Sequence, residues 1–334
     1  MTAVVRVACV QATPVVLDAS ATVAKACGLI GESGAAGDRL VALPEAFVSL
    51  YPSSAWAHAA ARFGRRPAEL HRRLWDQSVD IPGPLTERLG EAARRARAWV
   101  AAGVNERASR RPGTLWNALL WLAPDGRLAG RHRKLQPTLH ERVFWGQGRG
   151  DDLGAHPAGF GRLGGPICWE NVMPAARTRL HREGVDFYVA PTADDRDVWV
   201  AAMRAFAFEA GAFLLSPVQY LPRSAFPGDF PMSEELAGCP DDLLTGGSVI
   251  CDPWGNVLCG PVRGREEILY ADCDTGAIIA ARRVLDVAGH YERPDVDVAG
   301  PAGPGCPWPG CAVGSDPLCP HAQERAAVQV QFGA

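Results

Sequence analysis

Four short segments of this 334-residue chain carry a side chain capable of chemistry at a strand end or in a loop. One of these side chains is Cys168, which stands between an apolar segment and a predicted helix that begins at Pro174. At such a strand-to-helix turn, backbone N–H groups and the helix N-terminus can lower the pKa of a thiol. We therefore expect a nucleophilic thiolate at Cys168. We expect the other nine of the ten cysteines to be inert thiols.

Lysine is almost absent from the chain. Only Lys25 and Lys134 are lysines, although lysine and arginine together number 34. Arg131 and Arg133 flank Lys134, so arginine would be expected there if only a positive surface charge were needed. Lysine offers a compact ammonium that can be desolvated and can share a proton, which a guanidinium cannot do. The pattern favours a chemical role for Lys134, and chance retention on a surface turn is the alternative.

Two glutamates complete the set. Glu45 directly follows a short predicted strand, and Glu141 lies seven residues beyond Lys134. Each has an ordinary alternative: Glu45 could be a solvated charge or a helix N-terminal residue, and Glu141 could pair with Arg133 or Arg142. A base, an ammonium and a thiol can together attack an electrophilic carbon without a metal or cofactor. Two carboxylates near one lysine would keep its ammonium charged.

Alternating β and α segments are predicted to position these residues, which indicates a single α/β domain over residues 3–295. The predicted strands cover 4–11, 39–43, 99–104, 115–122, 187–190 and 213–218, and the predicted helices cover 19–33, 85–98, 174–182 and 196–210. Residues 247–252 and 268–272, separated by a turn at 253–256, are expected to form a closing hairpin.

The composition excludes several classes of protein. The formal charge of −3 gives no reason to expect nucleic acid or an anionic membrane as a partner. The N-terminus lacks a signal-peptide pattern, and the apolar runs are too short to span a bilayer. We therefore expect a cytoplasmic protein with reduced thiols. No C-x-x-C, P-loop, dinucleotide loop or H-x-x-x-H pair occurs, so neither a metal nor a cofactor is predicted.

The last segment has a different composition. Between residues 300 and 320, 11 of 21 residues are Gly or Pro, and three cysteines lie there. Such a segment buries too little surface to offset its ordering entropy, so 296–334 is predicted to be a flexible tail. Its Cys306, Cys311, Cys319 and His321 could alternatively hold zinc. A metal-binding or scaffold protein is therefore the alternative function from a different class.

Taken together, the four segments resemble the nitrilase superfamily of carbon–nitrogen hydrolases, and specifically its nitrilase branch. That family's catalytic Glu, Lys and Cys match Glu45, Lys134 and Cys168 in the same chain order, and a second active-site glutamate of the family matches Glu141. The matching motifs are Pro44-Glu45, Arg133-Lys134-Leu135-x-Pro137-Thr138 and Cys168-Trp169-Glu170-Asn171, with further similarity at 103–107, 190–194, 246–249 and 287–291.

The resemblance implies a four-layer α-β-β-α sandwich and a mechanism. Glu45 would act as general base, and Cys168 would attack a nitrile carbon to form a thioimidate. Lys134 and the backbone N–H of Trp169 would stabilise the developing charge, and Glu141 would hold Lys134. Loss of ammonia and hydrolysis of a thioester would give a carboxylic acid. The resemblance also implies a homo-oligomer, either a dimer or a larger spiral.

Some alternatives remain within the family. The Cys-Trp-Glu-Asn form resembles nitrilases more than amidases, so a nitrilase is expected. A cyanide hydratase or dihydratase and a thiol amidase or carbamoylase are the alternatives. Tyr51, Trp145 and Trp169 are candidate substrate-binding residues, with core packing as the alternative for Tyr51 and Trp145. Pro166 departs from the family pattern, because it replaces a residue whose backbone N–H a central strand would normally use.

Overall fold

The computed structural model of the chain describes residues 2–293. Residues 2–290 belong to one compact unit. The predicted tail 296–334 with its cysteines, and the predicted domain end at 295, lie outside the described residues.

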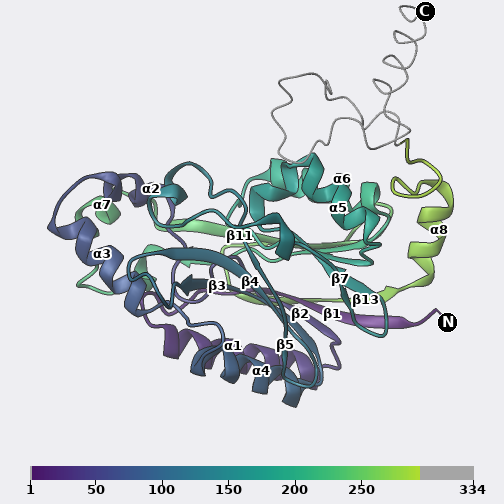
Figure 1. Cartoon of the computed structure of the whole chain (residues 1–334), viewed down its shortest axis with the longest axis horizontal. Coiled ribbons are helices and arrows are strands. Elements are labelled where there is room, and N and C mark those ends of the chain that lie inside the picture. Colours follow the sequence, from purple (N-terminus) through teal and green to yellow (C-terminus); the bar gives the residue numbers. More distant parts are fainter. Residues whose placement is uncertain (1, 294–334) are drawn as a thin grey trace, which may run out of the picture. The chain divides into compact units, whose positions relative to one another are not determined.

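Two β-sheets form the centre of this unit (Figure 1). The first has the strand order β13-β1-β2-β3-β4-β5, and the second has the order β10-β11-β9-β8-β7-β6, with β12 paired to β11. The strands of the first sheet are β1 (Val4–Gln11), β2 (Leu40–Ala42), β3 (Trp99–Arg107), β4 (Leu115–Leu122), β5 (Leu128–Arg133) and β13 (Glu267–Asp274). Those of the second are β6 (His156–Pro157), β7 (Arg162–Gly164), β8 (Phe187–Val189), β9 (Phe213–Ser216), β10 (Tyr220–Pro222), β11 (Asp242–Cys251) and β12 (Val257–Arg263).

Helices cover the outer face of each sheet (Figure 1). The first sheet carries α1 (Ala19–Ala35) and α4 (Pro84–Ala96), and the second carries α5 (Pro174–Arg182) and α6 (Asp197–Ala210). The remaining helices among the described residues are α2 (Ser54–Ala57), α3 (Arg65–Asp76), α7 (Ser233–Ala237), α8 (Gly276–Val284), and 3₁₀ turns at His58–Ala61, Leu139–Val143, Gly150–Asp152, Cys168–Val172 and Arg223–Ala225.

The alternation of side chains along β1 shows why the layers form. Val5, Val7 and Cys9 point into the core between the two sheets, whereas Ala8 and Val10 pack under α1 and α4. Because successive strand residues face opposite sides, a strand that is apolar on both faces must be covered on both. The sequence of β1 therefore requires a layer on each side, and the four-layer α-β-β-α sandwich is confirmed.

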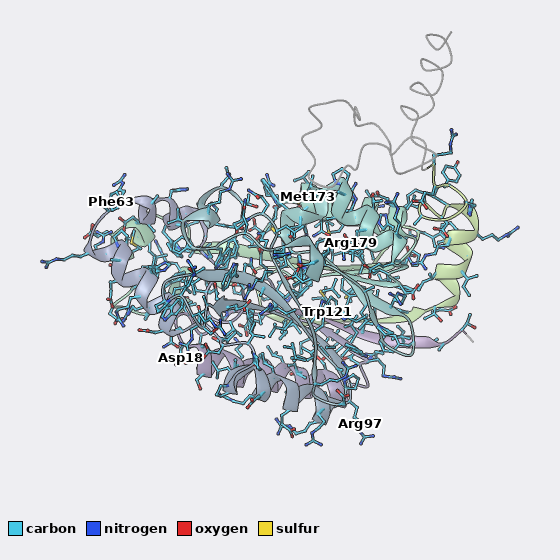
Figure 2. The ribbon with its side chains drawn as sticks, viewed as in Figure 1. Asp18, Phe63, Arg97, Trp121, Met173 and Arg179 are labelled. Carbon is cyan, nitrogen blue, oxygen red and sulfur yellow. The ribbon has the colours of Figure 1, made fainter. Side chains whose placement is uncertain are left out.

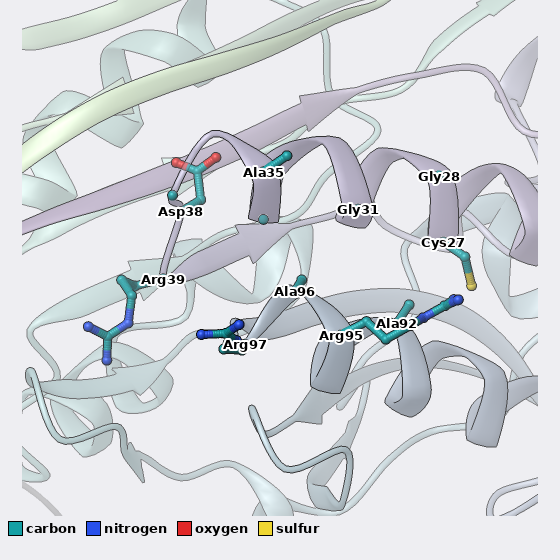
Figure 3. A pocket seen from close by; sticks show the side chains of 12 residues that line it. Cys27, Gly28, Gly31, Ala35, Asp38, Arg39, Ala92, Arg95, Ala96 and Arg97 are labelled. Atoms are coloured by element: carbon teal, nitrogen blue, oxygen red, sulfur yellow. The ribbon is translucent and has the colours of Figure 1, made fainter.

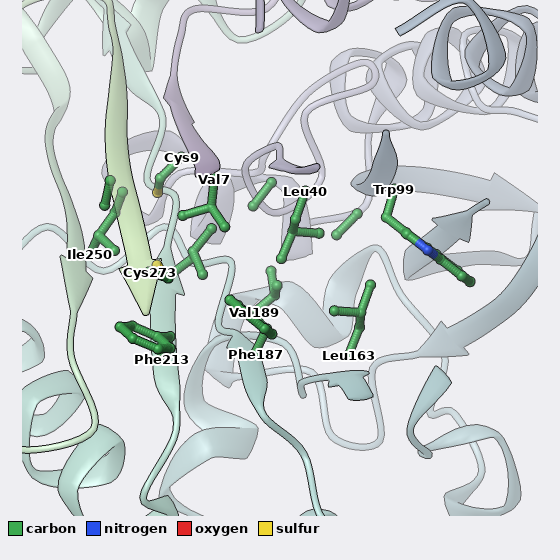
Figure 4. Close-up of a cluster of buried hydrophobic side chains, with 14 of the residues drawn as sticks. Val7, Cys9, Leu40, Trp99, Leu163, Phe187, Val189, Phe213, Ile250 and Cys273 are labelled. Carbon is green, nitrogen blue, oxygen red and sulfur yellow. The ribbon is translucent and has the colours of Figure 1, made fainter. Parts of the chain in front are cut away.

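The core between the sheets is apolar (Figure 4). Val7, Leu40 and Trp99 from the first sheet face Phe187 and Phe213 from the second. The rings of Phe187 and Phe213 stack with centroids 5.6 Å apart. Burial of such side chains contributes about 1.5–3 kcal/mol each, so this layer holds the two sheets together.

The helix ends follow local sequence signals. Asp18 caps α1 by accepting a hydrogen bond from the backbone N–H of Ala21 at 2.9 Å, and it lies at the edge of the molecule (Figure 2). Pro84 opens α4, and Arg97 follows its last residue in the left-handed region with φ +53°. A cap of the Asp18 kind contributes about 1 kcal/mol.

The predicted closing hairpin is wrong. The turn after β11 leads into β12, which pairs antiparallel with β11, and β13 crosses to the first sheet to pair with β1 from Val4–Asp274 to Gln11–Glu267. The sequence of β12 did not identify it as a strand, because it contains Gly260-Pro261 and lacks an apolar alternation. In the structure β12 is partly exposed. Pairing of β13 with β1 depends on a long-range contact that periodicity does not reveal.

A close approach between backbones positions the segment that carries Glu45. The N–H of Leu43 donates to Ala101 O at 2.8 Å and that of Val48 to Gly103 O at 3.2 Å, so residues 43–48 run along β3. A Cβ on Gly103 would lie 2.1 Å from the Pro44 carbonyl oxygen and 2.8 Å from the Glu45 Cα. Only glycine fits there without moving Glu45.

We expect Gly103→Ala to lower the free energy of unfolding by about 1–3 kcal/mol, because the added methyl overlaps the Pro44 carbonyl. Gly28→Ala is the matched control: no atom lies within 4 Å of its added Cβ and the position is helical, so stability should stay equal or rise by up to ~1 kcal/mol. Urea unfolding measures both. Equal stability of the two variants would contradict the close approach.

Candidate active site

Lys134 lies at the centre of the site. It follows β5 directly, its backbone N–H donates to Asn117 O at 2.8 Å, and its side chain is fully buried. The ammonium Nζ lies 2.7 Å from Glu45 Oε1 and 2.7 Å from Glu141 Oε2. Burial alone would lower the pKa of Lys134, but the charges of Glu45 and Glu141 outweigh burial and raise that pKa above its ordinary value. The ammonium is therefore charged at neutral pH.

Glu45 is buried at the end of β2 with one oxygen unused. Its Oε1 accepts hydrogen bonds from Lys134 and from Asn117 Nδ2, the latter at 2.7 Å. Its Oε2 has no hydrogen-bond partner among the described residues. Burial is the largest influence on the pKa of Glu45 and raises it; Lys134 opposes this and Glu141 reinforces it, leaving a pKa of about 7. A carboxylate with a free oxygen and this pKa suits a general base at neutral pH.

Glu141 is held by three donors. Besides Lys134, Tyr51 OH donates to its Oε1 at 2.7 Å and the backbone N–H of Thr138 donates to its Oε2 at 2.8 Å. Burial and the charge of Glu141 raise the pKa of Tyr51 well above its ordinary value, so the phenol remains a donor. With its lone pairs occupied in this way, Glu141 fixes the direction of Lys134 rather than serving as a free base.

Cys168 occupies a strained turn. It is the first residue of the 3₁₀ turn Cys168–Val172 and has a φ of +54°, in the left-handed region. Its N–H donates to Pro191 O at 2.8 Å, and Asn171 Nδ2 donates to its carbonyl oxygen at 2.7 Å. A non-glycine residue with positive φ stores strain that its surroundings must hold in place. Here that conformation fixes the position of Cys168 relative to the turn.

Pro166 does not disturb the sheet. Strand β7 ends at Gly164, so Pro166 lies beyond the last ladder hydrogen bond. Its carbonyl oxygen accepts from Asn171 Nδ2 at 3.2 Å. The preceding Gly165 explains the local path, since a Cβ there would lie 1.8 Å from Val189 O.

The expected thiolate at Cys168 is wrong for the free protein. Burial is the main influence and raises the pKa of Cys168 well above its ordinary value, and the charge of Glu45 adds to it. Lys134 lowers that pKa, as does the Thr192 hydroxyl, which donates to Sγ at 3.0 Å, but both effects are smaller. The turn sequence did not reveal that the residue is 4% exposed beside two carboxylates. Cys168 therefore rests as a thiol and needs a base to react.

A cavity of about 650 Å³ adjoins this thiol. Cys168, Glu141, Tyr51 and Trp169 contribute to its wall. Lys134 and Glu45 are fully buried and do not line it, but Lys134 bonds directly to Glu141 in its wall. The other lining residues are Ser53, His58, Ala61, Thr138, Leu139, His140, Val143, Ala193, Asp194, Asp195, Arg196, Leu243 and Leu244.

The three aromatic candidates have different surroundings. Tyr51 and Trp169 line the cavity, and Trp169 Nε1 donates to Asp194 Oδ2 at 2.9 Å. Trp145 is 3% exposed and does not line this cavity. Its Nε1 donates to Asn105 Oδ1 at 2.7 Å, and its ring centre lies 6.0 Å from Lys134 Nζ. Trp145 thus packs beside the lysine rather than facing the cavity.

A second cavity, of about 970 Å³, lies between α1 and α4 (Figure 3). Gly28, Gly31, Cys27 and Arg95 are among its lining residues. None of the predicted site residues borders it, so the two cavities are separate.

Sequence reasoning missed several residues of the site. Asn117 was a detectable signal, as a lone amide in the otherwise apolar strand β4. Thr192 lay in the matched segment 190–194 without an assigned role. Gln219 donates to the Glu45 carbonyl oxygen at 2.6 Å, and nothing in its local sequence marks it. Within residues 2–293, no group of three or more side chains could hold a metal ion.

We expect iodoacetamide to alkylate Cys168 at a rate that keeps rising above pH 9, because burial and Glu45 hold its pKa well above the ordinary value. The rate at Cys168 is read by peptide mass spectrometry, with Cys168→Ala as the blank. A plateau in rate near pH 7 would show instead that Cys168 is a thiolate in the free protein.

Comparisons with known proteins agree with this geometry. The sequence model of the family described as carbon-nitrogen hydrolase matches residues 6–283. The chain is 44% identical to an aliphatic nitrilase of Sinorhizobium fredii, over 87% of this chain and 93% of that protein. It is 39% identical to a bifunctional nitrilase/nitrile hydratase of Nicotiana tabacum, over 88% of this chain and 85% of that protein.

Solved structures share the fold. Saccharomyces cerevisiae Nit3, described as a member of branch 10 of the nitrilase superfamily, superposes with a TM-score of 0.66 at 19% identity. The alignment covers 87% of this chain and 97% of that one. From the matched family, the identities and the shared sandwich together, it follows that this chain belongs to the carbon–nitrogen hydrolase family, in the nitrilase branch of its superfamily.

Proposed function

We propose that the protein is a nitrilase, which hydrolyses an organic nitrile to a carboxylic acid and ammonia through a covalent intermediate on Cys168. The observation that carries this proposal is the buried Lys134 ammonium, held between Glu45 and Glu141 at 2.7 Å from each. A nitrile has no leaving group until its nitrogen has gained protons, so a nucleophile and a source of positive charge must act together. Identity to nitrilases over most of the chain favours nitriles over amides.

In the first half of the reaction, Sγ of Cys168 attacks the nitrile carbon while Glu45 accepts the thiol proton. One bond of the C≡N triple bond breaks, and the nitrogen receives that proton, which gives a thioimidate. Lys134 and the backbone N–H of Trp169 stabilise the negative charge that develops on nitrogen. The thiol rests protonated and the pKa of Glu45 is about 7, so a proton transfer to Glu45 accompanies attack.

In the second half, a first water adds to the thioimidate carbon with Glu45 as base. The tetrahedral intermediate loses ammonia to give a thioester. A second water hydrolyses the thioester, which releases the acid and restores the thiol. If the C–S bond breaks before the C–N bond, an amide is released instead. Relatives described as bifunctional nitrilase/nitrile hydratases make this branch worth measuring.

The setting of the reaction is also part of the proposal. The chain acts without metal or cofactor, as a homo-oligomer that is either a dimer or a larger spiral. It acts in the cytoplasm, and neither nucleic acid nor a membrane is its partner. The family resemblance supports the assembly, and the near-balanced charge supports the absence of a polyanionic partner. Among the described residues, no helix is both long and apolar enough to cross a membrane.

We expect purified protein to release ammonia from at least one of an aliphatic nitrile, benzonitrile, phenylacetonitrile or cyanide, with acid and amide measured by chromatography. Cys168→Ala should abolish turnover, because no other group forms the covalent bond. Lys134→Arg should lower kcat at least ~10²-fold, since a guanidinium cannot occupy the fully buried position of the ammonium between two carboxylates.

Lys25→Arg is the matched control for Lys134→Arg. It changes the only other lysine, which pairs with Glu266 at the surface, so activity should remain. Turnover of amides but of no nitrile would refute the proposed substrate class. Full activity in Cys168→Ala would refute the nucleophile.

The pH profile should have an acid limb near pH 7. Glu45 accepts a proton only when ionised, and its pKa is about 7, so kcat/KM should fall about tenfold for each pH unit below that value. Glu141→Gln removes a negative charge that raises the pKa of Glu45, and should move the limb to lower pH. Glu266→Gln, at the surface pair with Lys25, is the control and should leave it in place.

His140, one of the two histidines that line the cavity, offers a rival explanation for an acid limb. Burial lowers its pKa from the ordinary value, so it titrates in the acidic range as well. A limb that moves in His140→Gln but stays in Glu141→Gln would assign the titration to the histidine and contradict the role given to Glu45.

A further inference from the structure

His132 is buried between two carboxylates behind the active site. It lies on β5, two residues before Lys134, and is 1% exposed. Its Nδ1 lies 2.7 Å from Asp152 Oδ1, and its Nε2 lies 3.1 and 3.2 Å from the two oxygens of Glu170. A neutral imidazole has only one N–H, whereas ionised carboxylates only accept. With both carboxylates ionised, contacts of hydrogen-bond length at both ring nitrogens require the imidazolium.

Glu170 connects the two reactive segments. Its Oε1 accepts from the backbone N–H of Leu135, and its Oε2 accepts from that of Ile167, each at 2.5 Å. Leu135 directly follows Lys134, and Ile167 directly precedes Cys168. One fully buried carboxylate thus bonds to the residue next to the ammonium and to the residue next to the thiol.

We propose that the His132 imidazolium is a positioning group, which holds Glu170 and through it sets the placement of Lys134 relative to Cys168. This inference rests on the proposed function only in treating Lys134 and Cys168 as the reacting pair. His132 itself touches neither. Its charge compensates a carboxylate that would otherwise be buried without a counter-ion, and such a carboxylate would lose its fixed position.

The charges around His132 are nearly all paired with each other. Flanking Arg131 and Arg133 on β5 both bond to Glu106 of β3, and Lys134 bonds to the active-site glutamates. Strand β4 places the apolar Leu119 opposite His132. The 3₁₀ turn Gly150–Asp152 also brings Asp151, which pairs with Arg149, and β8 brings the phenol of Tyr188 near Glu170. Asp152 and Glu170 are therefore the groups that act on His132 directly.

This arrangement has a consequence for the pH profile. Burial alone would lower the pKa of His132, but its bonds to Asp152 and Glu170 raise it to about 9. The other nearby groups hold their protons more tightly. The pKa of Cys168 is raised well above its ordinary value of 9.0, and that of Tyr51 well above 10.0. The pKa of Lys134 is raised above its ordinary value of 10.5. Among these four groups His132 should thus be the first to lose its proton as the pH rises above 7, giving an alkaline limb near pH 9. The same shift stabilises the fold fully below about pH 6.5, and that contribution is lost as pH rises through 9.

The decisive variant is Asp152→Asn, because Asp152 is partly exposed and contacts neither reactive residue. Asparagine keeps the shape and one acceptor but removes the charge, so the alkaline limb of kcat/KM should move about 1 pH unit lower. Asp151→Asn, the neighbouring carboxylate bonded to Arg149, is the matched control and should leave the limb unchanged. If the alkaline limb of kcat/KM had the same pH midpoint in both variants, the proposal would be overturned.

His132→Gln tests the positioning effect itself. It should lower kcat about 10- to 100-fold at pH 7, as expected for a small misplacement of reacting groups, and remove the limb near pH 9. His181→Gln, which replaces a partly buried histidine on α5, should do neither. Circular dichroism establishes whether each variant is folded. A folded His132→Gln with unchanged kcat and an unchanged limb would overturn the proposal.

Protonation of His132 is read independently of activity. In NMR spectra of protein with ¹⁵N-labelled histidine, the signal of His132 is identified by its disappearance in His132→Gln. That signal should show two protonated ring nitrogens at pH 7.5. The midpoint of its titration should lie about 1 pH unit lower in Asp152→Asn. A neutral ring at pH 7.5 would refute the imidazolium whatever the enzyme hydrolyses. The kinetic comparisons use whichever substrate, nitrile or amide, the unmodified protein turns over, so failure on nitriles refutes the proposed function alone.

Discussion

A buried ammonium between two buried carboxylates is the interaction on which the rest of the structure depends. Lys134, Glu45 and Glu141 have almost no solvent contact, and charges removed from water are stable only when their partners stay in place. Each of the three comes from a different part of the chain: the end of β2, the end of β5 and the 3₁₀ turn Leu139–Val143. The fold must therefore bring two strand ends and one 3₁₀ turn together, so that their side chains lie within hydrogen-bond distance.

Neutral donors complete this arrangement. Asn117, Tyr51 and the Thr138 N–H occupy most of the remaining carboxylate lone pairs, and Oε2 of Glu45 is the oxygen left over. Donors that already point at the carboxylates need no reorganisation when a proton moves. The structure thus separates one carboxylate that can take a proton from one that serves as a fixed counter-charge.

The thiol depends on the same electrostatic balance. Two carboxylates and one ammonium leave an excess of negative charge beside Cys168, which together with burial favours the protonated thiol. In the proposed mechanism, reaction at the thiol then needs substrate and base at the same moment, so a free thiolate is not left to react with other electrophiles. Behind this set, His132, Asp152 and Glu170 form a second group of paired charges that borders both reactive segments.

The sequence by itself determined most of the elements and marked the candidate reactive residues. The strand at 4–11, the helix at 19–33 and the helix that begins at Pro174 are predicted from local patterns, and the structure contains all three elements within a few residues of the predicted bounds. The unusual lysine and the order Glu45, Lys134, Cys168 were also visible, because residue type and spacing are properties of the chain alone.

Only the tertiary structure decided what depends on contacts between distant residues. Pairing of β13 with β1 joins residues more than 250 positions apart, and no local pattern encodes it. The raised pKa of Cys168 comes from burial and from charges on other elements, whereas the turn sequence indicated the opposite direction. The roles of Asn117, Gln219 and His132 likewise follow from the atoms that surround them after folding, since burial and electrostatic fields are properties of the packed molecule.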